Sequence, residues 1–183
     1  LAWALRKAER YVEAEALVLE AVEIRKRLHG PEHEWTLETM DVLADVYDEM
    51  DADEKAAEVR SQQLAIKRRT LGEVHLSTAQ TMLNLGGSYD ALSQYLKASE
   101  LYARALAIRQ KLLGAEHEDT LSTMETLATH YDGLAQFAKA EPLRTQLLAI
   151  SRKVHGEEHP VTATRLHESA ATLNNAGNRA LAL

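Results

Sequence analysis

The sequence lacks cysteine and has only three prolines, eight glycines and 5% aromatic residues in 183 positions. Without cysteine there is no disulfide and no thiolate metal site, which suits a reducing compartment, and we expect a cytoplasmic protein. Because aromatics are scarce, the 45% hydrophobic residues must form a core of Leu, Ala, Ile and Val, which is typical of packed helices. The shortage of Pro and Gly leaves long uninterrupted segments for such helices.

Long apolar runs are also missing. No stretch approaches the roughly 20 residues that cross a bilayer, and no secretory signal is present, so we predict no membrane partner. The net charge of −7 argues against nonspecific binding to nucleic acid, which requires neutralisation of phosphates. The chain opens with LAWALRKAER, without an initiator Met, and we interpret it as part of a longer protein.

What the sequence does contain is a repeat of 42 residues, the interval between Gly30 and Gly72. Five columns of residues keep this interval in one register, and a period of this length predicts a solenoid of repeated helical units. The columns are Ile24, Ile66, Ile108 and Ile150; Gly30, Gly72, Gly114 and Gly156; His33, His75, His117 and His159; Thr36, Thr78, Thr120 and Thr162; and Ala14, Ala56, Ala98 and Ala140.

Each period contains two helical patterns, here called helix A and helix B, separated by short turns. We predict A helices over about 34–50, 76–92, 118–134 and 160–176, and B helices over about 11–29, 54–71, 95–113 and 137–155. Residues 1–10 fit the back half of a further A helix. The Gly column is predicted to end each B helix in a left-handed conformation. The array divides into a partial repeat 1–30, repeats of about 31–72, 73–114 and 115–156, and a partial repeat 157–183.

Small and large residues alternate in a way that lets the helices pack. Gly86 belongs to a small column with Ala44, Ala128 and Ala170, which allows helix A to approach helix B closely, whereas Gly87 is expected to face the groove. A Leu-small-x-x-Tyr pattern recurs around these positions, as Leu43, Ala44 and Tyr47, as Leu85, Gly86 and Tyr89, and as Leu127, Ala128 and Tyr131.

This pattern resembles the tetratricopeptide repeat over the whole length of the chain. Ile108-Arg109, followed by Leu113, Gly114 and His117, resembles the 42-residue variety found in kinesin light chain. The resemblance implies an all-α, right-handed solenoid of stacked antiparallel helix pairs. It also implies a scaffold for protein–protein interaction, with no catalytic residues, no cofactor and no enzymatic activity.

Two other chemistries were weighed against this reading. His29 with His33, and His155 with His159, have spacing that could suggest a metal pair, but a Gly breaks the helix between them. We predict that the repeated His packs against or caps the loop between helix B and helix A, and that no metal is bound. Basic clusters at 25–27, 67–69 and 152–153 could form a nucleic-acid ridge, but they lie at the ends of B helices. There they complement the helix dipole, and we favour that structural reading.

In the resembled fold the A helices line the concave groove. The candidate partner-binding residues on that face are Glu38, Asp41, Asp45, Asp48, Asn84, Asp90, Glu125 and Asp132. Opposing cations are expected to be few, mainly Arg6 and Lys7. The groove is therefore predicted to take an extended or helical partner segment rich in Lys or Arg, with Asn84 contacting its backbone.

Two alternatives stay open from the residues alone. The array could be a spacer or assembly element with a merely solvated groove, or the regulatory sensor repeats of a larger signalling ATPase or enzyme.

The last A helix lacks its B partner, so Leu166, Ala170 and Leu173 are expected to leave an apolar strip. End-to-end self-association, or a longer native chain, would cover that strip.

Overall fold

The computed structural model describes the backbone of residues 2–181 and the side chains of residues 10–177. Over residues 2–181 the chain forms eight α-helices and no strand, which confirms the all-α prediction. The helices are α1 (Ala2–His29), α2 (Glu34–Glu49), α3 (Asp53–Thr70), α4 (Leu76–Ala91), α5 (Tyr95–Leu113), α6 (Glu118–Gly133), α7 (Phe137–His155) and α8 (Pro160–Leu181).

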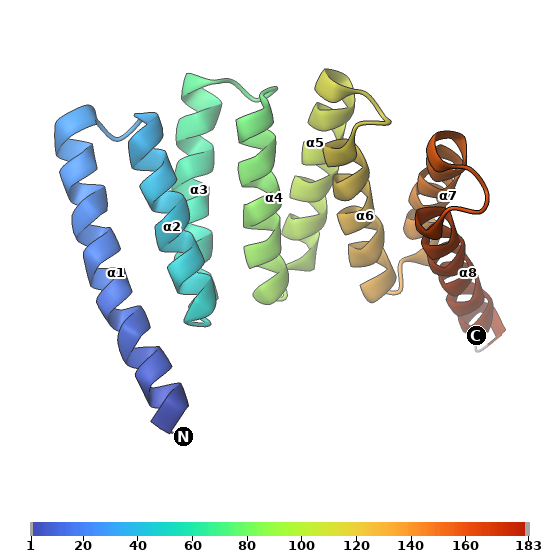
Figure 1. The fold of residues 1–183 in the computed structure, drawn as a ribbon, viewed down its shortest axis with the longest axis horizontal. Coiled ribbons are helices and arrows are strands. Elements are labelled where there is room, and N and C mark those ends of the chain that lie inside the picture. Colours follow the sequence, from blue (N-terminus) through green and yellow to red (C-terminus); the bar gives the residue numbers. More distant parts are fainter. Residues whose placement is uncertain (1, 182–183) are drawn as a thin grey trace. The chain divides into compact units, whose positions relative to one another are not determined.

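The chain divides into two compact units at a boundary inside α5, between Leu101 and Tyr102. In the first unit α1 packs on α2, α2 on α3 and α3 on α4, and in the second unit α6 packs on α7 and α7 on α8. Figure 1 shows that successive helices within each unit run in alternating directions. Each unit is therefore a stack of antiparallel helices, as a repeat of this length predicts.

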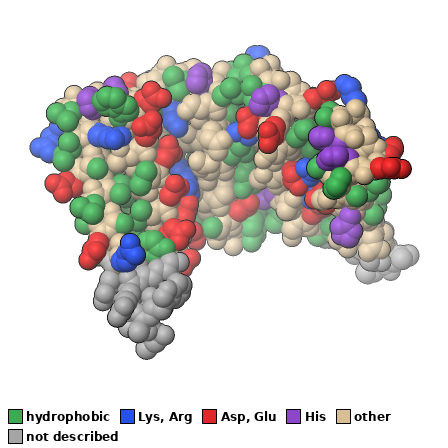
Figure 2. All heavy atoms as spheres, in the orientation of Figure 1, with side chains coloured by type: hydrophobic (Ala, Val, Ile, Leu, Met, Phe, Trp, Pro, Cys, Tyr) green, Lys and Arg blue, Asp and Glu red, His purple; other side chains and the backbone are tan. Residues whose placement is uncertain are grey.

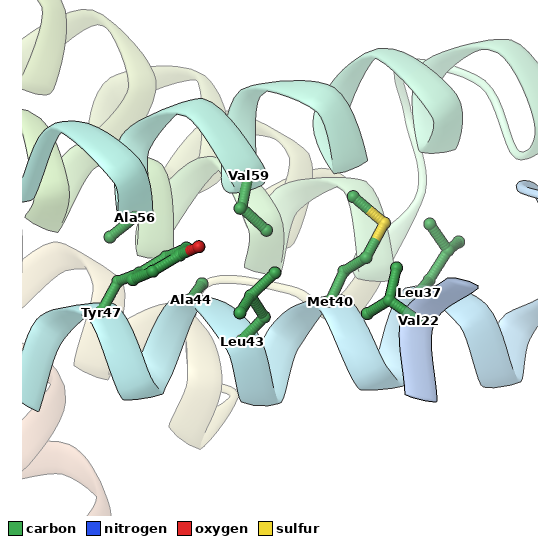
Figure 3. Close-up of a cluster of buried hydrophobic side chains, with 8 residues drawn as sticks. All are labelled: Val22, Leu37, Met40, Leu43, Ala44, Tyr47, Ala56 and Val59. Carbon is green, nitrogen blue, oxygen red and sulfur yellow. The ribbon is translucent and has the colours of Figure 1, made fainter. Parts of the chain in front are cut away.

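The core of the first unit is formed by apolar side chains that meet between α1, α2 and α3. Figure 3 shows them pointing into one cluster, and each is at most 9% exposed. On α2 they recur at three- and four-residue steps, which places them on a single helix face. The cluster comprises Val22 of α1, Leu37, Met40, Leu43, Ala44 and Tyr47 of α2, and Ala56 and Val59 of α3.

The two adjacent glycines of α4 lie on different faces of the helix. Gly86 is buried and Gly87 is exposed, in agreement with the predicted faces. Ala44 and Ala128, which occupy the position of Gly86 in the neighbouring repeats, are both 0% exposed. This column is small because there is no room for a larger side chain where two helices approach closely.

The loops from helix B to helix A are built by three of the repeated columns. Gly30, Gly72, Gly114 and Gly156 all have φ near 90°, a conformation that side-chain-bearing residues rarely adopt. The buried Thr hydroxyls of Thr36, Thr78 and Thr162 donate to the carbonyls of Gly30, Gly72 and Gly156 at 2.8–2.9 Å. The loop is thereby tied to the helix that follows it.

The repeated histidine caps the A helices, which confirms the structural interpretation of that column. The Nδ1 atoms of His33, His75, His117 and His159 accept hydrogen bonds from the backbone N–H two residues later at 3.1–3.2 Å. An accepting nitrogen carries no proton, so each cap requires the neutral ring with its proton on Nε2. A side-chain cap of this kind contributes about 1 kcal/mol to helix stability.

The terminal helices depart from the predicted boundaries. The sequence predicts a turn near Arg10 and another near Ala176, yet α1 runs unbroken through the first and α8 through the second. In the internal repeats this turn is held by a left-handed residue, Asp51, Ser93 or Ala135, with φ of 53–57°. Such a conformation is strained and needs two packed helices to impose it. Lys7-Ala8-Glu9-Arg10 has strong helix propensity, so α1 continues.

Candidate functional site

The candidate groove of the first unit centres on a buried arginine from α3. Arg60 is 6% exposed, and its guanidinium donates to Asp48 at 2.5 and 2.9 Å, to Asp45 at 3.2 Å and to the Ser88 hydroxyl at 2.7 Å. These acceptors come from α2 and α4. One B helix thus joins two successive A helices through a planar, permanently charged group, which suits several simultaneous bonds.

A hollow of about 370 Å³ lies over this arginine. It is lined by three predicted residues, Asp45, Asp48 and Asn84, and by the exposed Gly87. Figure 2 shows acidic side chains gathered along α2. The Asp45 side chain is 72% exposed and the Asp48 side chain 41% exposed, so both carboxylates remain accessible from outside.

The other predicted residues of this unit do not line the hollow. Asp41 accepts a hydrogen bond from the buried Gln63 amide at 2.9 Å, which assigns it to the α2–α3 contact. Glu38 is exposed, with its carboxylate 3.8 Å from Arg25. Asp90 is half-buried on α4. The Asn84 side-chain oxygen accepts a hydrogen bond from Gln80 at 2.8 Å.

In the second unit, Glu125 and Asp132 belong to one network of charges. Arg144 of α7, 6% exposed, donates to Asp132 of α6 at 3.1 Å and to Glu168 of α8 at 3.1 Å. Arg165 of α8 pairs with Glu125 at 2.5 Å and with Glu168 at 3.1 Å. The network connects α6, α7 and α8 in the way that Arg60 connects α2, α3 and α4.

The Arg165 guanidinium lowers the pKa of Glu125 by donating a hydrogen bond to its carboxylate, and partial burial only partly opposes this. A folded-state pKa below the unfolded value stabilises the fold at pH above the ordinary carboxyl pKa. That contribution is lost as pH falls from the ordinary carboxyl pKa through the lowered folded-state pKa. We expect Glu125→Gln to lose less stability than the parent between pH 7 and pH 3.5 in denaturant unfolding. Glu141→Gln, an exposed control, should follow the parent curve.

The expectation that opposing cations are few was wrong. Arg60, Arg144 and Arg165 all face carboxylates that were predicted to line the groove. Two of them come from B helices, although the candidate groove residues all belong to A helices. A long side chain can pass between two A helices and bring its charge to their outer face. The sequence contained a signal for these cations, since Arg60 and Arg144 occupy the same position of helix B in two repeats. Tyr102 occupies that position in the repeat between them.

Cations of the basic clusters at 67–69 and 152–153 bind other residues of the chain, in part across repeat boundaries. Lys67 is 8% exposed and donates to Thr81, Arg68 pairs with Glu73 at 2.7 Å, and Arg152 pairs with Glu157 at 3.0 Å. Arg69 pairs with Glu32, and Lys153 pairs with Glu116.

Among the described residues, no group of three or more His, Asp or Glu is arranged around a metal position. No described helix is long and apolar enough to cross a membrane.

Comparison with known proteins places these features in a family context. The tetratricopeptide repeat model matches residues 1–62, 54–111 and 89–153. A putative kinesin light chain with nearly identical TPR-like repeats from Podosopora anserina is 30% identical, with a TM-score of 0.83 over 99% of this chain and 87% of that one. BtubC (BKLC) from P. vanneervenii shares the fold at 23% identity, with a TM-score of 0.79 over 94% of this chain and 68% of that one. No curated protein matches the chain.

Proposed function

Because the chain belongs to the tetratricopeptide repeat family, we propose that it binds a Lys- or Arg-bearing segment of a partner protein along its A helices. Proteins of this family generally serve as scaffolds for protein–protein interaction and are generally not enzymes. The proposal includes the absence of catalytic activity and a cytoplasmic location.

The observation that carries the proposal is the charge of the hollow over Arg60. Its lining contains three carboxylates, Asp45, Asp48 and Asp53, and one guanidinium, Arg60. One positive charge cannot neutralise three negative ones, so the hollow keeps a net negative charge that favours a cationic partner. Asn84 supplies a side-chain amide that can bond to a peptide backbone. Gly87 beside it has no side chain, so nothing projects from this part of the lining.

The remaining predicted residues contribute different amounts of net negative charge to the proposed binding surface. Glu38 and Asp90 extend the acidic surface of the first unit, and Asp41 contributes negative charge from the α2–α3 contact. Glu125 and Asp132 are bound to Arg165 and Arg144, so they hold the helices in position and contribute little net charge. We therefore expect recognition of the basic segment to depend most on Asp45 and Asp48.

The test should remove negative charge and keep the bonds of Arg60 to Asp48 and Ser88. Asp45→Asn with Glu38→Gln changes two exposed carboxylates and leaves Asp48 on Arg60. We expect each lost charge to weaken binding of basic peptides from a display library about twofold to fivefold at low salt, mostly through slower association. The difference should shrink as salt rises. Asp51→Asn, an exposed carboxylate outside the hollow, is the matched control. Equal affinity and equal salt dependence for parent and double variant would identify a solvated spacer.

Self-association through α8 is a second element of the proposal. Leu166 and Leu173 are 39% and 53% exposed, and Ala170 is exposed between them, as the sequence predicts. An apolar strip of this kind is stabilised when the apolar face of another helix covers it. A second copy of the chain can supply such a helix. Sedimentation velocity should detect dimers in the micromolar range that Leu166→Glu with Leu173→Glu abolishes. A monomer at every concentration would exclude this mode of association.

A further inference from the structure

A second hollow, of about 460 Å³, lies in the second unit between α6, α7 and α8. Its wall is mixed: each of the three helices contributes apolar residues, and polar and charged residues stand beside them. The apolar residues are Leu121, Leu147, Ile150, Val154 and Val161. The volume falls within the range of about 300–1,000 Å³ that is typical of ligand pockets.

The hollow exists because this repeat lacks a long side chain that the others have. At this position of helix B the chain carries Arg25, Lys67 and Arg109, one per repeat, and then Ser151. Each long side chain reaches the next A helix: Arg25 donates to the Trp35 carbonyl, Lys67 to Thr81, and Arg109 to Thr123 at 2.7 Å. The short Ser151 side chain forms a hydrogen bond with Thr162 at 2.9 Å.

The partner position on helix A has changed in the same repeat. Thr81 and Thr123, which receive the long side chains, are followed one period later by Arg165. Arg165 does not fill the space over Ser151 but is held by Glu125 and Glu168. Ser151 and Arg165 both line the hollow, so the paired substitution accounts for its position.

The carboxylates of the lining are unequally neutralised. Glu125 is paired with Arg165, and Glu116 with Lys153. Glu118 is exposed at the start of α6 and has no hydrogen bond or ion pair in the described part of the chain. An apolar wall beside one unpaired carboxylate is complementary to an apolar side chain that has a cation near it.

We propose that this hollow is an anchor site for a partner segment. It takes one aliphatic or aromatic side chain, and a neighbouring Lys or Arg of the same segment reaches Glu118. The inference rests on the proposed function, namely that the chain binds basic segments, and it adds a requirement for an apolar anchor. The anchor occupies the volume that Arg109 or Lys67 fills from within the chain in the earlier repeats.

The test restores the arrangement of the preceding repeat. Ser151→Arg with Arg165→Thr recreates the pair formed by Arg109 and Thr123 and fills the hollow from within. Random 12-residue peptides displayed on phage are selected on the parent chain, and the enriched peptides are synthesised and measured by fluorescence anisotropy. We expect enrichment of an apolar residue close to Lys or Arg, and a loss of affinity of about tenfold or more on the filled variant.

Two further measurements separate the anchor from a general effect on the fold. Replacing the apolar residue of an enriched peptide by Ser should weaken binding to the parent but not to the filled variant, and Glu118→Gln should weaken it about twofold to fivefold. Circular dichroism and thermal unfolding establish that the filled variant is folded. Enriched peptides without an apolar residue would overturn the proposal, and so would equal binding to the parent and the filled variant. If the filled variant is unfolded, the proposal is overturned when replacing the apolar residue of the peptide by Ser leaves binding to the parent unchanged.

The two proposals fail in different ways. If Asp45→Asn with Glu38→Gln weakens binding and the filled variant does not, the basic-segment function stands and the anchor is rejected. If only the filled variant weakens binding, the anchor stands and the acidic hollow over Arg60 is rejected as the recognition surface. If neither variant has an effect, both are rejected.

Discussion

Arg144→Met is expected to lower the free energy of unfolding by about 2–3 kcal/mol. Methionine keeps an apolar stem of similar length, so the change removes mainly the guanidinium. Asp132 and Glu168 then lose their shared donor while each stays 23% exposed. Breaking a fully buried pair typically costs about 3–5 kcal/mol, and access of water to both carboxylates places this pair below that range. Thr172 and Arg165 continue to donate to the two carboxylates.

Denaturant unfolding at neutral pH measures this difference, because the midpoint shifts with stability. Lys111→Met is the matched control, since Lys111 is exposed and makes no ion pair in the described residues; its effect should stay within about 0.5 kcal/mol. Adding Asp132→Asn to Arg144→Met should recover part of the loss, because one uncompensated charge is gone. A single variant as stable as the Lys111→Met control would show that the network does not hold the three helices together.

Gly86→Leu is expected to destabilise the chain by about 1–3 kcal/mol, and Gly87→Ala to stabilise it by up to about 1 kcal/mol. Gly86 is buried in the column whose other internal members, Ala44 and Ala128, have no exposed surface. A leucine there must displace packed neighbours. Gly87 is exposed, so an alanine at this position meets water and mainly reduces the conformational entropy of the unfolded chain.

Thermal and denaturant unfolding of the two variants should therefore give shifts of opposite sign. Gly86→Ala is the matched control, since alanine is the residue of the neighbouring repeats and should cause only a small change at this site. Shifts of the same sign and size for Gly86→Leu and Gly87→Ala would mean that the two glycines do not lie on different faces of α4.

The sequence alone determined the helices and their pairing, because both depend on local patterns that repeat. The apolar spacing, the glycine column and the Leu-small-x-x-Tyr pattern predicted the internal helices to within one or two residues and the loops between them. The histidine caps could also be inferred, since a residue that precedes each A helix at a constant interval is placed to accept its first N–H groups. These features need no knowledge of distant residues.

The ends of α1 and α8 show where local patterns were insufficient. The turn between helix A and helix B forms in the internal repeats with a left-handed Asp, Ser or Ala at its centre. None of these residues favours that conformation strongly enough to impose it alone. The turn therefore depends on the packing of the two helices that it connects, which only the tertiary structure supplies.

The charge of the candidate groove also depends on tertiary structure, because residues of different helices meet there. The carboxylates of α2 could be placed on one face from their spacing, but the cation that faces them, Arg60, belongs to a different helix. Likewise, the hollow beside Ser151 arises from a missing side chain on α7 and a changed one on α8. Helix periodicity determines the face on which a residue lies. Which charge or which empty volume meets that face depends on how the helices pack, because electrostatic and packing energies depend on distances in space.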